Sequence, residues 1–229
     1  MSHFQNCITS SIGKKQIVAT TGLLLIIYVV LHLTGNLFIY AGPEAFNGWA
    51  AKLHSLGPIL RVFEYGLLFT FLIHIYFTYL VVLENMQARG VPYAISKPVG
   101  ERSLATRLMP YTGTFLFAFV IWHLLDFTFI DHNGPRSMMN GISMGLYGVV
   151  YNAFRNQLHS GLYIMAMGCL GFHLAHGIQS VFQTFGFNHP RYTPLIIEMS
   201  DFLGLVIAFS YSTIPILVLL HNARYKVGM

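Results

Sequence analysis

Long stretches without a charged side chain alternate with short polar segments along the whole chain. Five of these stretches, which contain no aspartate, glutamate, lysine or arginine, are residues 16–43, 65–83, 108–125, 156–190 and 202–223. An α-helix rises about 1.5 Å per residue, so about 20 apolar residues cross the roughly 30 Å of hydrocarbon in a bilayer. None of the five stretches shows the strict alternation of a membrane β-strand. The pattern predicts an all-α integral membrane bundle of five transmembrane helices.

The expected spans cover residues 16–41, 59–86, 107–130, 156–186 and 196–223, and the loops between them are short. Gly42-Pro43 and Gly57-Pro58 mark turns in the loop after the first span. No polar segment is long enough to fold separately. We therefore expect residues 1–229 to form a single membrane-anchor domain, whose chemistry lies inside the bundle or with bound partners.

Composition supports a membrane protein and argues against a nucleic-acid partner. Hydrophobic residues make up 55% of the chain and charged residues only 9%, whereas a soluble globular protein has about 25% charged residues. The net charge is +5, but the basic residues are scattered through loops and helix ends rather than clustered. In a membrane protein such residues set the topology. The lipid bilayer is the expected environment of the apolar surface.

The distribution of lysine and arginine predicts the orientation of the chain. Six basic residues lie near the amino terminus or in or beside the loop after the second span: Lys14, Lys15, Arg89, Lys97, Arg102 and Arg107. Four lie on the opposite side: Lys52, Arg61, Arg136 and Arg155. Arg191 adds to the first group, whereas Arg224 and Lys226 count against it. The positive-inside rule then predicts a cytoplasmic amino terminus and a multi-pass topology in the membrane.

Histidine is the most informative residue type in the apolar spans. The chain has eleven histidines, and five of them lie deep in apolar helices: His32, His74, His123, His173 and His176. An ionisable side chain inside a bilayer is costly and usually functional. A single histidine of this kind could have a purely structural role, as a hydrogen-bonding group across a helix interface. Because four spans each carry at least one such histidine, these residues indicate a shared function. The other histidines are expected near water.

The four spans place their histidines at two depths. At 1.5 Å per residue, His32 and His123 both lie roughly 24 to 26 Å from the inner ends of their helices. His74 and His173 lie roughly 15 to 18 Å from the same side. Two histidines on different helices at one depth suit the two faces of a planar iron porphyrin. Two such levels predict two haem b groups.

Bis-histidine ligation would leave no open iron position for oxygen, so the expected role is electron transfer. Gly35 and Gly177 offer small surfaces against which a macrocycle could lie, although small residues also serve ordinary helix packing. His176 projects from nearly the same face as His173, three residues earlier. His173 suits the depth pairing better, and His176 is expected either to support the haem environment or to pack.

With these residues in view, the chain resembles the dihaem cytochrome b membrane-anchor subunits of succinate:quinone oxidoreductases, which include succinate dehydrogenases and fumarate reductases. The resemblance covers almost the whole chain and rests on the order and spacing of short fragments. These are Val30-Leu31-His32-Leu33, Gly42-Pro43-Glu44-Ala45-Phe46-Asn47, Arg61-Val62-Phe63-Glu64, Ile73-His74, Thr112-Gly113, Ile121-Trp122-His123, Phe172-His173, Gly177 and Thr184-Phe185-Gly186.

The resemblance implies an electron relay in the bacterial inner (cytoplasmic) membrane. His74 and His173 would ligate the inner haem, and His32 and His123 the outer haem. A flavoprotein subunit and an iron-sulfur subunit on the cytoplasmic face would interconvert succinate and fumarate. Electrons would pass between them and a membrane quinone, menaquinone by analogy, near the outer end. The chain would belong to an enzyme only as a subunit of that complex.

Quinone chemistry needs a group that handles protons at the membrane edge. Glu64 is the best candidate because it begins the second span near the outer level. A helix-end carboxylate favoured by the helix dipole is the alternative interpretation. Arg61 could contact a quinone carbonyl or a haem propionate, or could simply reach toward water. Asp126, one turn after His123, could belong to the outer haem environment or have no role there.

Two other functions fit parts of the pattern. The first is the cytochrome b subunit of another membrane oxidoreductase, such as a hydrogenase or formate dehydrogenase, in which the ligand histidines would lie in other helices and spacings. The second is a haem-free transporter whose histidines relay protons. Against the transporter, the five spans show no evident inverted repeat, and the histidines lie at paired depths rather than along a continuous path.

Overall fold

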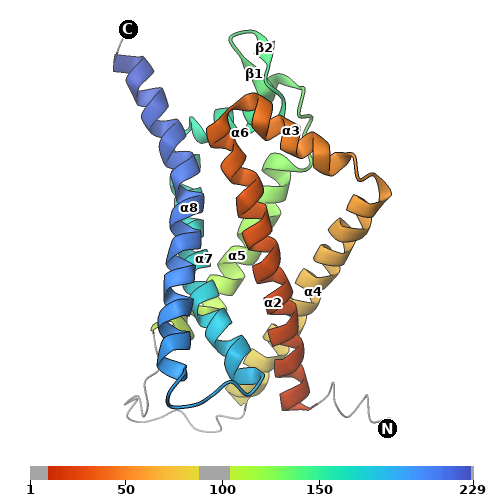
Figure 1. Ribbon diagram of the computed structural model, residues 1–229, viewed down its shortest axis with the longest axis vertical. Helices are drawn as coiled ribbons and strands as arrows, with labels where there is room; N and C mark the ends of the chain where they lie inside the picture. Colours follow the sequence, from red (N-terminus) through yellow and green to blue (C-terminus); the bar gives the residue numbers. More distant parts are fainter. Residues whose placement is uncertain (1–9, 88–103, 228–229) are drawn as a thin grey trace.

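The chain forms a bundle of long helices with a small cap at one end (Figure 1). The computed structural model describes residues 10–87 and 104–227. Its elements, in order, are α2 Ser11–Leu37, η1 Phe38–Ala41, α3 Pro43–His54, α4 Pro58–Gln87, α5 Leu104–Phe127, η2 Pro135–Ser137, β1 Met138–Met139, β2 Ile142–Ser143, α6 Gly145–Phe154, α7 Gln157–Thr184 and α8 Thr193–Val227.

Five of the described helical segments are long and apolar enough to cross a membrane, which confirms the predicted all-α bundle of five spans. They are Ser11–Ala41, Pro58–Gln87, Leu108–Phe127, Gln157–Thr184 and Thr193–Arg224. The first begins earlier than the charge pattern indicated. Ser10 caps α2 by accepting a 3.0 Å hydrogen bond from the Gly13 backbone N–H, so the helix already includes Lys14.

The helices α2, α5 and α8 run in one direction, and α4 and α7 run back (Figure 1). The most extensive helix pair is α7 with α8, and α2 packs against α4, α7 and α8. Glycines allow α7 and α8 to approach closely: a Cβ at Gly204 would lie 2.5 Å from the Gly171 carbonyl oxygen. Small residues at such a crossing let two backbones pack directly inside a membrane.

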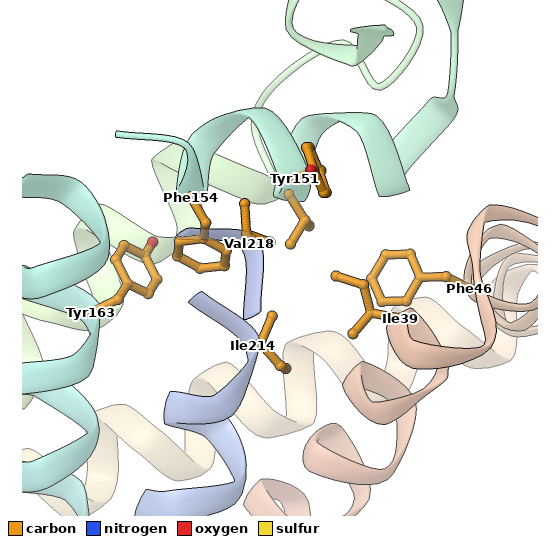
Figure 2. Packing of buried hydrophobic residues seen from close by; sticks show 8 residues of the cluster. Ile39, Phe46, Tyr151, Phe154, Tyr163, Ile214 and Val218 are labelled. Atoms are coloured by element: carbon orange, nitrogen blue, oxygen red, sulfur yellow. The ribbon is translucent and has the colours of Figure 1, made fainter. Parts of the chain in front are cut away.

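We call the end of the bundle that carries α3, α6 and the β1–β2 hairpin the cap end. A buried apolar cluster holds this end together (Figure 2) and consists of Ile39, Phe46, Val150, Tyr151, Phe154, Tyr163, Ile214 and Val218. Asn47 also joins α3 to the start of α6 within the cap end. Its Nδ2 donates to the Met144 carbonyl at 2.9 Å, and its Oδ1 accepts from the Tyr147 N–H at 3.0 Å.

Helix α4 lies at the edge of the bundle and has no buried residue. It packs mainly against α2, and apolar side chains cover the rest of its surface. Val62 and Phe69, for example, are 71% and 67% exposed. Such a surface suits contact with lipid rather than with water. At the opposite end from the cap, Lys14 of α2 forms an ion pair with Glu84 of α4.

Candidate haem-binding centre

The fold brings His32 of α2 and His123 of α5 together near the cap end. Their ring centroids lie 5.9 Å apart and their planes cross at 87°. Metal–imidazole bonds of about 2 Å on opposite sides of one ion would put two ring centres about 6 Å apart. An edge-to-face ring pair has a similar spacing without a metal. The separation therefore fits two imidazole ligands of one metal ion.

An aromatic shell surrounds these two imidazoles. Tyr28 stacks on His32 with centroids 5.4 Å apart, and Tyr211 of α8 lies 6.2 Å from the same ring. The Tyr211 hydroxyl donates a 2.8 Å hydrogen bond to the Val29 carbonyl, which links α8 to α2 beside the histidine. Phe119, Phe127 and Tyr163 border His123 at 5.9, 5.4 and 6.2 Å. This setting is apolar and suits a hydrophobic macrocycle.

The inner histidines each meet a threonine of the neighbouring helix. His74 Nδ1 lies 3.1 Å from Thr21 Oγ1, which joins α4 to α2. His173 Nδ1 lies 3.2 Å from Thr112 Oγ1, which joins α7 to α5. The two imidazoles lie within electrostatic range of each other. In both cases Nε2 is the ring nitrogen that remains for a metal.

A glycine beside each threonine makes room for the inner imidazoles. A Cβ at Gly22 would lie 3.2 Å from His74 Cε1, and a Cβ at Gly113 would lie 3.3 Å from His173 Cε1. Any larger side chain would press on the ring. The glycines that accommodate the inner histidines are therefore Gly22 and Gly113.

Residues 21–32 and 112–123 share one pattern, in which Thr-Gly is followed by nine residues and then histidine. Each segment supplies one outer histidine and the threonine that contacts the inner histidine of the next helix. The pairs α2–α4 and α5–α7 are thus built alike. The repeated spacing was available in the sequence and would have identified both threonines.

The surroundings of Gly35, Gly177 and His176 differ from one another. Gly35 faces Trp49 of α3, because a Cβ there would lie 2.6 Å from the indole Nε1. This glycine serves helix packing in the cap rather than a macrocycle surface. No atom comes within 4 Å of a Cβ placed at Gly177. His176 is half-buried, and its Nε2 lies 3.2 Å from the Ser180 hydroxyl one turn along α7.

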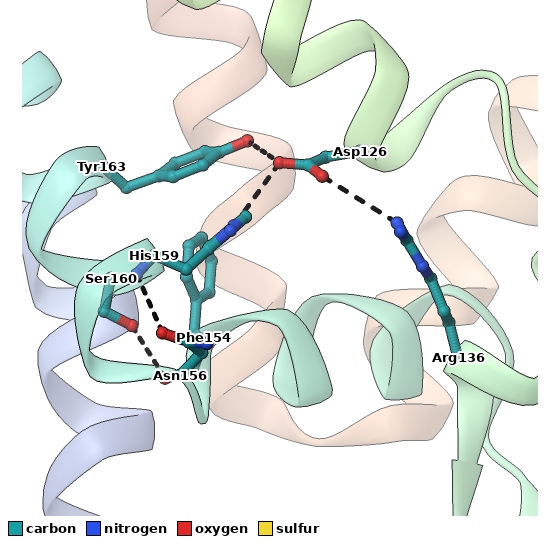
Figure 3. A network of polar contacts seen from close by, with 7 residues as sticks. All are labelled: Asp126, Arg136, Phe154, Asn156, His159, Ser160 and Tyr163. Carbon is teal, nitrogen blue, oxygen red and sulfur yellow. Dashed lines mark hydrogen bonds and ion pairs between the residues drawn. The ribbon is translucent and has the colours of Figure 1, made fainter.

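A polar network lies beside the outer pair at the cap end (Figure 3). Its centre is the Asp126 carboxylate on α5, whose side chain is 13% exposed. Tyr163 donates a hydrogen bond to Asp126 at 2.9 Å, His159 Nε2 lies 3.4 Å away, and Arg136 approaches at 3.8 Å. Asp126 therefore joins α5, α7 and η2.

His159 departs from the expectation that it lies near water. Its side chain is only 17% exposed and stacks on Tyr163, with ring centroids 4.8 Å apart. Trp122 packs against it edge-on at 5.1 Å. The expectation failed because His159 starts a membrane helix in the sequence, while the fold covers that position with α5.

Arg61 and Glu64 form an ion pair with each other at the start of α4. Arg61 Nη1 donates to Glu64 Oε2 at 2.8 Å, and both side chains are exposed at 69% and 46%. Glu64 lies within electrostatic range of the Tyr28 phenol, which stacks on His32. Glu64 thus stands at the margin of the outer pair, and the described contacts of Arg61 lead to Glu64 alone.

Within residues 10–87 and 104–227 the structure shows no cluster of three or more histidine, cysteine, aspartate or glutamate side chains suited to a bare metal ion. A haem has a different requirement, because the porphyrin itself supplies four nitrogens and the protein needs to add at most two. The arrangement of imidazoles in pairs fits that requirement.

Comparison with known proteins gives one informative similarity. No protein-family model matches the chain, and no solved structure gives a significant match. The chain is 26% identical over 189 residues to the succinate dehydrogenase cytochrome b558 subunit of Bacillus subtilis (strain 168), covering 81% of this chain and 84% of that protein. The five spans agree with a multi-pass membrane protein, and the similarity is to a cytochrome b subunit of a succinate dehydrogenase.

Proposed function

We propose that the chain is the haem-binding membrane subunit of a succinate dehydrogenase or fumarate reductase, and that it carries electrons between an iron-sulfur subunit and a membrane quinone. Two b haems, held by His32 with His123 and by His74 with His173, would supply the one-electron chemistry. The observation that carries the proposal is the close approach of His32 and His123 from separate membrane helices. The similarity to a succinate dehydrogenase cytochrome b subunit supports it.

The chain's own residues would orient the haems and keep water from them. Each haem would take one ligand from the pair α2–α4 and one from the pair α5–α7, so that it bridges the two pairs. The aromatic rings around His32 and His123 would exclude water from the outer site. His176 would support the inner site from one turn below His173, where it already meets Ser180.

Quinone reduction or oxidation would take place near the outer pair, with Glu64 as the group that exchanges protons. Its exposed carboxylate and its proximity to Tyr28 support this role. Arg61 would hold the carboxylate in place through their ion pair or turn toward a quinone carbonyl. The quinone would be menaquinone, as the family resemblance implies.

The catalytic partners would bind at the end of the bundle opposite the cap. A flavoprotein subunit and an iron-sulfur subunit would dock there on the cytoplasmic side of a bacterial inner membrane, close to the inner histidines. The amino terminus and the basic residues Lys14, Lys15 and Arg191 support this orientation. The chain would hold no dicarboxylate site of its own.

Pigment analysis and optical spectroscopy test this function directly. The purified chain is expected to contain two b-type haems, with bands in a reduced-minus-oxidised spectrum that succinate elicits when the partner subunits are present. One haem per chain or none would contradict the two-site proposal. Co-purification with hydrogenase or formate dehydrogenase subunits would favour the other cytochrome b function, and a haem-free protein would favour a transporter.

A further inference from the structure

The threonines next to the inner histidines have their only hydroxyl proton engaged elsewhere. A hydroxyl has one proton and two acceptor lone pairs. Thr21 Oγ1 lies 2.7 Å from the Ile17 carbonyl, and Thr112 Oγ1 lies 3.1 Å from the Leu108 carbonyl, each one turn earlier in its own helix. A carbonyl can only accept, so each threonine donates to its carbonyl. Each hydroxyl is then left as an acceptor toward the histidine.

Giving each threonine proton to its carbonyl assigns the ring proton to Nδ1. His74 Nδ1, at 3.1 Å from Thr21, and His173 Nδ1, at 3.2 Å from Thr112, are then the donors of these hydrogen bonds. In a neutral imidazole the other nitrogen then has the free lone pair. Nε2 is therefore the nitrogen with a lone pair available to a metal in both residues.

Among the described residues, His123 of the outer pair has no comparable arrangement. The Nδ1 atom of His123 is buried and has no hydrogen-bond partner among the described residues. The nearest neighbours of its ring are aromatic side chains and His32. The two levels thus differ in how the protein holds its imidazoles, although the helices that carry them share the same sequence pattern.

We propose that Thr21 and Thr112 are positioning residues for the inner haem. Each holds an inner histidine in the tautomer and ring orientation that presents Nε2 to iron. The proposal rests on the proposed function, because it takes His74 and His173 as ligands. A hydrogen bond from Nδ1–H also makes an imidazole a stronger donor to a metal, and such supporting contacts typically change metal affinity about 10- to 100-fold.

The test uses Thr21→Val and Thr112→Val in the full complex with its partner subunits. Valine keeps the branched shape and removes the acceptor oxygen. We expect haem to pass from the inner site to added apomyoglobin about 10- to 100-fold faster. The midpoint potential of the inner haem should rise because a weaker donor stabilises ferric iron less. The outer haem should keep its potential.

Matched controls lie on the same two helices. Thr34 and Thr114 also donate to carbonyls one turn earlier, Val30 at 3.0 Å and Pro110 at 2.8 Å, but both are exposed. Thr34→Val and Thr114→Val should leave both haems unchanged. Thr21→Ser restores the oxygen without the methyl group and should recover the potential. The two valine variants test the two pairs independently if one of them accumulates poorly.

Three results would overturn the inference. Unchanged haem transfer and potential in both valine variants, with loss of the inner haem in His74→Ala, would reject the positioning role and leave the proposed function standing. Equal effects of Thr21→Val and of Thr21→Ser, which keeps the oxygen, would show that the acceptor oxygen does not account for the effect. An inner haem that survives both His74→Ala and His173→Ala would reject the proposed ligands, and with them this inference.

Discussion

The Tyr163 hydroxyl of α7 donates a 2.9 Å hydrogen bond to the Asp126 carboxylate of α5. The carboxylate is one turn beyond His123, and the Tyr163 ring lies 6.2 Å from that imidazole. The same tyrosine stacks on His159 and contributes to the buried cluster of the cap. One side chain thus connects the packing of the cap to the setting of the outer histidine pair.

Removing the centre of this network should destabilise the bundle. Asp126→Ala leaves the Tyr163 hydroxyl without its acceptor, which we expect to cost about 1–3 kcal/mol of unfolding free energy. Thermal unfolding in detergent, followed by circular dichroism, measures the loss. Asp131→Ala, which changes an exposed carboxylate in the nearby loop, serves as the control. Equal melting temperatures for the two variants would show that the network adds no stability.

The pairing of histidines predicts which haem each substitution removes. His74→Ala or His173→Ala should abolish the inner haem, about half of the total, and spare the outer one, because each site needs both ligands. His32→Ala and His123→Ala should do the reverse. Haem content per chain and redox titration of the optical bands show which of the two haems is lost. Loss of the same haem by His32→Ala and His74→Ala would contradict the pairing.

Glu64→Gln should slow quinone turnover by about 100-fold or more, because proton transfer by a positioned group contributes at least that much. Both haem spectra should remain intact, since the side chain lies at the margin of the outer pair. The measurement is succinate-dependent reduction of a soluble quinone analogue by the complex. Glu44→Gln, at the start of α3, is the control. Turnover at the normal rate in Glu64→Gln would remove this residue from the proton path.

The crossing of α7 and α8 should not tolerate a side chain. In Gly171→Ala the new Cβ would lie 2.9 Å from the Gly204 carbonyl oxygen, and the forced separation should cost about 1–3 kcal/mol. Gly168→Ala, on the same helix with no atom within 4 Å, should be neutral or slightly stabilising. Thermal unfolding compares the two. A Gly171→Ala protein as stable as Gly168→Ala would mean that the helices adjust without strain.

The number and type of the spans could be predicted from the sequence because hydrocarbon excludes charge, so five charge-free stretches required five membrane helices. The histidines were equally visible, since an ionisable residue stands out in an apolar span. Simple rise per residue also placed His32 level with His123, and the fold brings these two rings together.

The partners of those histidines were decided by the tertiary structure alone. Helices that are apolar on nearly every side, as α4 is, carry no periodic signal of which face meets a neighbour, so rotation and register come from packing. Packing brought Thr21 to His74, turned Gly35 toward Trp49 and buried His159 against Tyr163. Hydrophobicity thus determined which segments enter the membrane, and the fit between their side chains determined which residues meet there.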